Sequence, residues 1–304
     1  MTERLQKAGG SALMTKGEKA MSVLEAIIQG IIQGLTEFLP VSSSGHLSVF
    51  QHFFGINGEE AVLSTIVMHM GTLVAVFIAF RKKIFALIKE FFSMIKDIFT
   101  GKFSYKEMNG NRRMIVMIIV SILPLFVFYI FKDFFAGLSS DNDIMVEGFA
   151  FIYTSVLLYI ADRHSNGTKT AGETTVKSAL TIGAFQGIAL VPGISRSGST
   201  ISGALLTGMK REDAVEYSFI LGIPVILAGA LVEFKDVGTA ASESLGVLII
   251  GFVVSAVVGY LAIGLLKWLI KYNKFRVFSI YTFILGVAVI TAGILEKAGV
   301  ISVG

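Results

Sequence analysis

The 304-residue sequence contains no cysteine, only four prolines and one tryptophan, and charged residues make up only 16% of it. The absence of cysteine excludes a disulfide framework and a thiolate metal site. Soluble domains carry about 25% charged residues. A charge content this low, together with a hydrophobic fraction of 54%, indicates an integral membrane protein.

Residues 1–20 differ from the rest of the chain because they are polar. They lack an apolar core long enough for a signal peptide, and we predict a disordered tail outside the fold. The hydrophobic region begins at Met21. From there on we predict one integrated membrane domain.

Six apolar runs are long enough to cross a bilayer core of roughly 30 Å. They lie at 60–80, 114–131, 148–162, 215–232, 245–266 and 277–295. Two further apolar stretches, 22–55 and 178–208, are interrupted near the middle by Pro, Gly and Ser. Such interruptions are typical of re-entrant helix hairpins, whose broken backbone is buried in protein.

Basic residues are concentrated in alternate connections between the predicted spans. Eighteen Lys and Arg residues fall in the connections 81–113, 163–177, 209–214 and 267–276. The opposite connections hold Lys132, Lys235 and Lys297, beside acidic residues that include Glu147. Because basic loops stay in the cytoplasm, we predict that the first set is cytoplasmic and that both termini lie outside.

The two interrupted stretches resemble each other. At an offset of 153 residues, seven of the twenty positions from 26 to 45 are identical without a gap. This indicates an internal repeat, with halves at 21–165 and 174–304 that each hold one hairpin and three spans. A re-entrant hairpin returns the chain to the side from which it entered, and three spans then carry it to the opposite side. The second half therefore starts on the other side of the membrane and is inverted relative to the first. We therefore predict an all-α polytopic membrane protein with an inverted-topology repeat and its site where the two breaks meet.

Each interrupted stretch also carries two glycines four residues apart. They are Gly30 and Gly34 in the first stretch, and Gly183 and Gly187 in the second. Small residues at this spacing let membrane helices pack closely, and we expect packing to be their whole role.

Few ionisable residues remain at membrane depth, where each charge costs at least ~2.5 kcal/mol. They are Glu37, Arg196, His46 and His69. Glu37 lies in the first break and Arg196 in the second, so the inverted fold predicts that they meet in one cavity. A purely structural ion pair is the plainer alternative. We expect His69 to be a packed or interfacial histidine and leave it outside the predicted site.

Seven hydroxyl side chains accompany these charges in the two breaks. They are Ser42, Ser43, Ser44, Ser195, Ser197, Ser199 and Thr200. One or two are expected to cap the helices that follow. The free N–H groups of those helices and the Arg196 guanidinium favour an anion such as phosphate. A serine within reach of His46, oriented by Glu37, forms a typical nucleophile and base pair. A transporter or lipid flippase with the same anion-binding cavity stays open as an alternative.

The motifs QGLTEFLPVSSSGH (33–46) and PGISRSGST (192–200) closely resemble those of the bacterial undecaprenyl-diphosphate phosphatases, the bacitracin-resistance proteins. The resemblance covers residues 21–304. It implies an enzyme of the bacterial plasma membrane that hydrolyses undecaprenyl diphosphate to undecaprenyl phosphate and phosphate, with an active site opening outward. The product would return as the lipid carrier to peptidoglycan synthesis.

The resemblance also implies roles for single residues. The catalytic set would be Ser43 as nucleophile with His46, Glu37 and Arg196, although Ser42 or an activated water stays open as the nucleophile. Phosphate binding would fall to Ser42, Ser44, Ser195, Ser197, Thr200 and Gln33. Family members use Mg²⁺ or Ca²⁺, for which Glu37 is the candidate ligand, and Gln33 stands where a second Glu is common. The expected partners are the polyprenyl diphosphate and membrane lipids, with no nucleic acid and a homo-oligomer left open.

Overall fold

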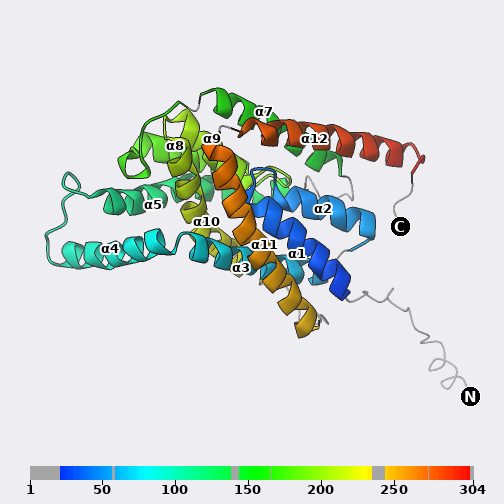
Figure 1. The fold of residues 1–304 in the computed structure, drawn as a ribbon, viewed down its shortest axis with the longest axis horizontal. Helices are drawn as coiled ribbons and strands as arrows, with labels where there is room; N and C mark the ends of the chain where they lie inside the picture. Colours follow the sequence, from blue (N-terminus) through cyan, green and yellow to red (C-terminus); the bar gives the residue numbers. More distant parts are fainter. Residues whose placement is uncertain are drawn as a thin grey trace, which may run out of the picture.

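The structure is a computed structural model that describes residues 21–56, 59–137, 144–164, 166–234, 244–272 and 274–301. Across these residues the regular elements are helices, without a β-strand (Figure 1). The tail predicted at 1–20 and the loop residue Lys235 fall outside this part of the chain, and the side chain of Lys132 is not described.

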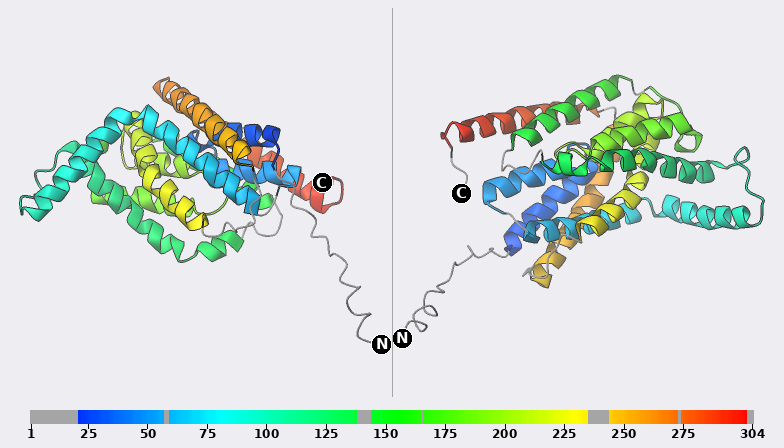
Figure 2. Two further views of the ribbon diagram at one scale, coloured as in Figure 1. Left: turned by 90° about the horizontal axis from the view of Figure 1, so that it is seen from below. Right: turned by 180° about the vertical axis from the view of Figure 1, so that it is seen from behind.

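Six of the helices are long and apolar enough to cross a membrane, which confirms the number of predicted spans. They are α3 (Glu59–Ala79), α5 (Gly110–Tyr129), α7 (Met145–Arg163), α10 (Arg211–Glu233), α11 (Leu245–Lys271) and α12 (Arg276–Lys297). Figures 1 and 2 show α7 beside α12 along one edge, where the two helices are in contact. The chain is therefore an all-helical protein built as a polytopic membrane protein.

The two interrupted stretches form two pairs of short helices. The helices are α1 (Val23–Phe38) and α2 (Ser43–Phe54) in the first stretch, and α8 (Val176–Ile188) and α9 (Arg196–Leu206) in the second. Each pair is in contact along its length, as expected for a helix hairpin. The breaks at 39–42 and 189–195 fall where the proline, glycine and serine residues interrupt the apolar pattern.

Equivalent serines cap the helices that follow the two breaks. Ser42 accepts a hydrogen bond from the Gly45 N–H at 3.2 Å, and Ser195 accepts one from the Gly198 N–H at 3.0 Å. Both bonds satisfy an N–H group that the first turn of a helix leaves unpaired. The two caps stand 153 residues apart, so the sequence repeat extends to these contacts.

The remaining helices are α4 (Arg81–Phe99), α6 (Lys132–Gly137) and the short 3₁₀ helix η1 (Ala171–Glu173). After the single residue Phe80, the chain of α3 continues as α4, which packs along α5 (Figure 2). Arg112 of α5 joins the two helices through ion pairs with Glu90 at 2.7 Å and Asp97 at 2.8 Å.

The glycine pairs lie at close helix contacts, which confirms the packing prediction. Helix α1 packs against α11, and a Cβ atom added to Gly34 would lie 2.8 Å from the Val258 Cβ. In the second half α8 packs against α5, where a Cβ on Gly187 would overlap the Phe128 ring. No larger side chain fits at either position unless the helices move apart.

The four basic connections lie at one end of the helix bundle. Gly110 approaches Gly172, and Lys169 forms an isolated β-bridge with Met209. The beginning of α4, the beginning of α10 and the end of α11 line one further cavity. The four connections that the charge count assigns to one side of the membrane are therefore close together in the fold.

One predicted loop residue is buried, and its placement in a connection was wrong. Glu147 lies in the first turn of α7 and is only 2% exposed. Its carboxylate accepts a hydrogen bond from the Ser48 hydroxyl of α2 at 2.9 Å. The third span begins at Met145, three residues before its predicted start, so it draws Glu147 into the bundle.

Candidate active site

A cavity of about 160 Å³ lies where the two breaks meet. Its walls come from the end of α1, the beginning of α2, α3, the beginning of α9 and the C-terminal half of α10. Seven of the ten predicted site residues line it: Glu37, Ser42, Ser43, Ser44, Ser195, Arg196 and Ser197. We call this cavity the chamber.

The backbones of the two breaks are in direct contact beside the chamber. A Cβ atom added to Gly45 would lie 3.2 Å from the Gly193 Cα, and one added to Gly198 would lie 3.3 Å from the Pro40 carbonyl oxygen. Residues 40 and 193 are themselves 153 apart, so the two contacts are reciprocal. Only residues without a side chain allow the breaks to approach this closely.

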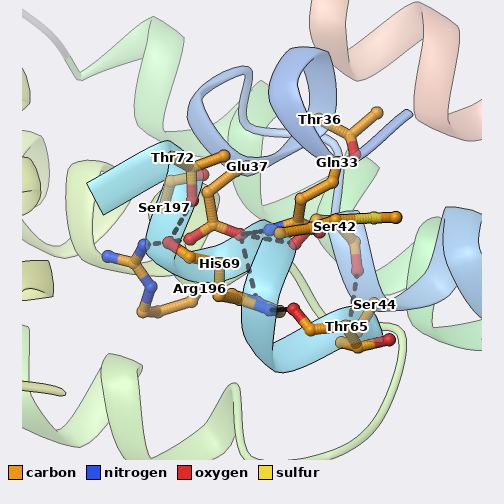
Figure 3. Close-up of polar contacts among 12 residues, drawn as sticks. Gln33, Thr36, Glu37, Ser42, Ser44, Thr65, His69, Thr72, Arg196 and Ser197 are labelled. Carbon is orange, nitrogen blue, oxygen red and sulfur yellow. Dashed lines mark hydrogen bonds and ion pairs between the residues drawn. The ribbon is translucent and has the colours of Figure 1, made fainter. Parts of the chain in front are cut away.

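Glu37 is the centre of the polar contacts in the chamber (Figure 3). Its carboxylate is 5% exposed and forms an ion pair with Arg196 at 2.5 Å. It also accepts hydrogen bonds from the Gln33 amide at 3.1 Å and from the Ser43 hydroxyl at 2.6 Å. The predicted meeting of Glu37 and Arg196 is thus confirmed, and three donors satisfy a carboxylate that lipid would otherwise exclude.

Ser43 owes its position to an unusual backbone. Ser42 has φ of 75°, and it is the one residue other than glycine with positive φ in the described chain. Such conformations cost of order 1–3 kcal/mol and persist where the surrounding contacts enforce them. The turn at Ser42 starts α2 at Ser43 and aims the Ser43 hydroxyl at Glu37.

His46 does not pair with Ser43, so the predicted serine–histidine contact is absent from the structure. Its Nδ1 lies 2.6 Å from the Ser42 carbonyl oxygen and its Nε2 lies 2.7 Å from the Tyr281 hydroxyl. Both ring nitrogens are therefore occupied, and the ring packs edge-on against Phe151 outside the chamber. Because His46 lies one turn into α2, it faces α7 and α12, whereas Ser43 faces Glu37.

Two other predicted site residues lie outside the chamber lining. The Thr200 hydroxyl is fully buried and bonds to the Arg196 carbonyl at 3.0 Å and the Ser218 hydroxyl at 2.5 Å. Its place in the second turn of α9 directs it toward α10, away from the chamber lining. Gln33 stands behind Glu37, one helical turn earlier, and reaches the site through that carboxylate.

The chamber includes a histidine that the sequence analysis left out. His69 of α3 lines the cavity, with its Nε2 3.6 Å from the Glu37 carboxylate. Its Nδ1 lies 2.8 Å from the Thr65 carbonyl oxygen. Since a carbonyl only accepts, Nδ1 carries a proton, and Nε2 is the nitrogen presented to the chamber. The sequence does contain a signal for this role, because His69 is a titratable residue in an otherwise apolar span.

Two buried polar atoms at the site have no hydrogen-bond partner. They are the Arg196 Nη1 and the Gln33 Oε1. Buried polar groups are nearly always satisfied, and Arg196, which lines the chamber, keeps one guanidinium nitrogen that bonds to no protein group. The small residue Gly222 makes room for this end of the guanidinium, because a Cβ there would overlap Arg196 Nη1.

Sequence comparison agrees with this geometry. The model of the family described as bacitracin resistance protein BacA matches residues 26–288, a range that includes both breaks and every residue of the chamber. The chain belongs to the BacA family.

Three relatives illustrate the similarity to BacA family members. An undecaprenyl-diphosphatase of Alkaliphilus metalliredigens is 40% identical over 278 residues, which cover 90% of this chain and 100% of the relative. One of Halothermothrix orenii is 41% identical over 89% of this chain and 98% of its own. Undecaprenyl-diphosphatase 4 of Bacillus thuringiensis subsp. konkukian is 40% identical over 89% and 97%, respectively.

Proposed function

We propose that this protein is an integral-membrane phosphatase that hydrolyses undecaprenyl diphosphate to undecaprenyl phosphate and inorganic phosphate. The names of its relatives supply the substrate, and the chamber supplies the chemistry. Release of the monophosphate recycles the lipid carrier for peptidoglycan synthesis and confers bacitracin resistance, in keeping with the family description.

One observation carries the proposal: the Ser43 hydroxyl donates a 2.6 Å hydrogen bond to a carboxylate that is itself paired with Arg196. A hydroxyl held on a carboxylate is poised to lose its proton as it attacks. An arginine at the same carboxylate brings a phosphate-binding group to the reacting atoms. A structural ion pair alone explains neither the serine nor the unpartnered Arg196 Nη1.

The reaction follows from these positions. The Ser43 oxygen attacks the terminal phosphorus, its proton passes to Glu37, and the bond from that phosphorus to the bridging oxygen breaks. Undecaprenyl phosphate leaves with the bridging oxygen. Water then attacks the phosphoserine and gives a proton to Glu37, which passes it to the Ser43 oxygen as the bond from that oxygen to phosphorus breaks and phosphate leaves. Direct attack by water deprotonated at Glu37 uses the same groups.

Two histidines would assist in different ways. His69 presents Nε2 to the chamber beside Glu37, and we assign it the relay that takes the Ser43 proton from Glu37 and delivers it to the leaving bridging oxygen. His46 would act as a positioning residue, because it holds the carbonyl of the strained Ser42 at 2.6 Å. Tyr281 fixes the other side of that ring.

Binding of the diphosphate would combine hydroxyl groups, backbone amides and the guanidinium. Ser44 and Ser197 line the chamber at the N-termini of α2 and α9, beside the capping serines Ser42 and Ser195. Helix N-termini favour anions through their free N–H groups and dipole. Arg196 Nη1 would donate to a phosphate oxygen and stabilise the charge that develops in the transition state.

A divalent cation, Mg²⁺ or Ca²⁺, fits this donor set in part. The described residues contain no group of three or more His, Cys, Asp or Glu residues placed to hold a metal ion. Glu37 accepts a hydrogen bond from the amide nitrogen of Gln33, whose Oε1 has no partner, and carboxylate and amide oxygens are ligands of the kind that hard cations take. These two side chains would hold a cation together with substrate oxygens, and the bound cation would neutralise phosphate charge.

The arrangement of the two halves supports an inverted-topology repeat, with repeats at 21–165 and 174–304. Equivalent caps, equivalent glycine contacts and the reciprocal approach of the two breaks all recur at the offset of 153 residues. With the basic end in the cytoplasm, both hairpins would be re-entrant, and both termini and the chamber opening would face outward.

Phosphate release tests the function directly. We expect purified protein in detergent to release inorganic phosphate from undecaprenyl diphosphate, and a chelator to slow the release if Glu37 and Gln33 hold a cation. A protein that moves the lipid across a vesicle membrane without phosphate release would be a transporter, and the proposal would be wrong. No release and no movement would leave the structural ion pair as the role of Glu37 and Arg196.

A further inference from the structure

A second and larger cavity of about 590 Å³ lies at the basic end of the bundle. Its walls come from the junction of α3 and α4, the first turns of α10 and the last turns of α11. The chamber opens between the other ends of α3 and α10, near Ile66 and Glu233. The two cavities therefore lie toward opposite ends of the same pair of helices. We call the second one the basic cavity.

The basic cavity has an excess of positive charge. Five basic residues line it: Arg81, Lys82, Lys83, Lys267 and Lys271. The acidic residues in its lining are Glu212 and Glu216, and Glu216 pairs with Lys83 at 3.2 Å. Five positive and two negative groups leave a formal charge of +3. Cavities of this size are typical of small-molecule and cofactor sites.

Two lysines of α11 line the cavity, and one of them lies over an aromatic ring. The Lys267 ammonium lies 3.9 Å from the centroid of the Phe80 ring, an aromatic face that also belongs to the cavity wall. Lys271 stands one helical turn later on the same face. The Glu216 carboxylate, which pairs with Lys83, is the acidic group that acts on Lys267. Lys82, Lys267 and Lys271 in the walls of one cavity favour an anion with several oxygens.

An apolar groove of about 280 Å³ lies along the same stretches of α3, α4 and α10 that line the basic cavity. Phe77, Ile84, Ile119 and Ile223 are among its walls, which come from α3, α4, α5 and α10. Ile84 follows Lys83 directly in the chain, and Ile220 of the groove lies one turn after Glu216. A basic cavity and an apolar groove with walls from neighbouring residues of the same helices match a molecule with a charged head and a hydrocarbon tail.

We propose that the basic cavity binds the headgroup of a lipid phosphate monoester whose hydrocarbon chain lies in the apolar groove. A monoester carries about −1.5 to −2 charge near neutral pH, which matches the lining charge of +3 better than the single charge of a phosphodiester headgroup. The site is separate from the chamber and does not depend on the proposed hydrolysis.

Native mass spectrometry of the purified protein in detergent tests this site with three probes: dioleoyl phosphatidic acid, dioleoyl phosphatidylglycerol and inorganic phosphate. We expect phosphatidic acid to bind more tightly than the other two. The double variant Lys267→Gln/Lys271→Gln should bind phosphatidic acid about thirtyfold more weakly, since each basic residue near a lipid headgroup contributes roughly fivefold. Lys102→Gln/Lys177→Gln removes the same charge from exposed positions on the same side and should leave binding within about threefold.

Each alternative result has a distinct meaning. Equal binding of phosphatidylglycerol and phosphatidic acid would overturn the assignment of a monoester. Displacement of phosphatidic acid by inorganic phosphate at equal concentration would show that the apolar groove does not contribute to binding. Unchanged binding by the Lys267 and Lys271 double variant would overturn the proposal. The single variant Lys271→Gln, expected to weaken binding about fivefold, replaces the double variant if that protein is unstable, and retained phosphate release shows that either variant is folded.

Discussion

The ion pair between Glu37 and Arg196 is expected to be strongly coupled, and a double-mutant cycle can measure that coupling. Glu37→Gln keeps the shape of the side chain but leaves the Arg196 guanidinium without its counter-charge. Breaking a buried pair from one side costs about 3–5 kcal/mol. Arg196 is 18% exposed and Glu37 is 5% exposed, so we expect about 3 kcal/mol for Glu37→Gln and at least as much for Arg196→Gln.

The double variant Glu37→Gln/Arg196→Gln removes both charges and should be more stable than either single variant. At about 2–4 °C per kcal/mol for a chain of this size, each single change should lower the thermal unfolding midpoint by roughly 6–12 °C. The midpoint would be followed in detergent, with phosphate release measured on the same samples. All three variants should lose at least about a hundredfold in rate, because each lacks the carboxylate base or the phosphate-binding group.

Glu107→Gln is the matched control, since Glu107 is exposed and lies in the connection after α4. It should change stability by no more than about 0.5 kcal/mol. Additive losses in the cycle would show that the two groups do not interact in solution. Recovery of full activity in the double variant would show that the pair has no part in catalysis.

Three further variants test other parts of the account. Ser43→Ala should reduce the rate of phosphate release by several orders of magnitude. Ser44→Ala, which removes a hydroxyl bonded to Ser42 at 3.3 Å, should reduce that rate only about fivefold. Equal effects of the two variants would show that Ser43 is not the nucleophile. His69→Asn should lower kcat by a factor of about 10²–10⁴ and remove one limb of the pH–rate profile. The control is His52→Asn, because His52 pairs with Glu296 away from the chamber, and it should change neither kcat nor the profile. An unaltered profile for His69→Asn would show that His69 only packs. Gly34→Val should destabilise the protein by about 1–3 kcal/mol, because its Cβ would press on Val258. The control Gly264→Val should not destabilise the protein in this way, because a Cβ at Gly264 meets open space. Equal unfolding midpoints for the Gly34 and Gly264 variants would contradict the close packing of α1 on α11.

The sequence predicts the architecture because its signals are strong and local. Long apolar runs identify the spans, and the interruptions near Pro40 and Pro192 identify the breaks. The repeat then relates the breaks to each other, and the opposite charges of Glu37 and Arg196 predict their contact. These inferences depend on periodicity, length and the cost of charge in lipid, which a single sequence displays directly.

The sequence does not predict the directions in which side chains point, because these depend on how the helices pack against one another. The short spacing from Ser43 to His46 suggests a pair, yet the backbone at Ser42 turns the histidine toward Tyr281, 235 residues away in sequence. His69 looks like a packed residue until α3 is placed against Glu37. Likewise, no local pattern shows that Glu147 faces Ser48 inside the bundle.

The most direct test of the hydrolytic centre is an experimental structure with a non-hydrolysable undecaprenyl methylenediphosphonate bound. We expect the terminal phosphonate in the chamber, within hydrogen-bonding distance of Arg196 Nη1, with the Ser43 hydroxyl facing its phosphorus opposite the bridging carbon. A terminal phosphonate bound outside the chamber, or with Ser43 and Arg196 on separate sides of the protein, would contradict the account.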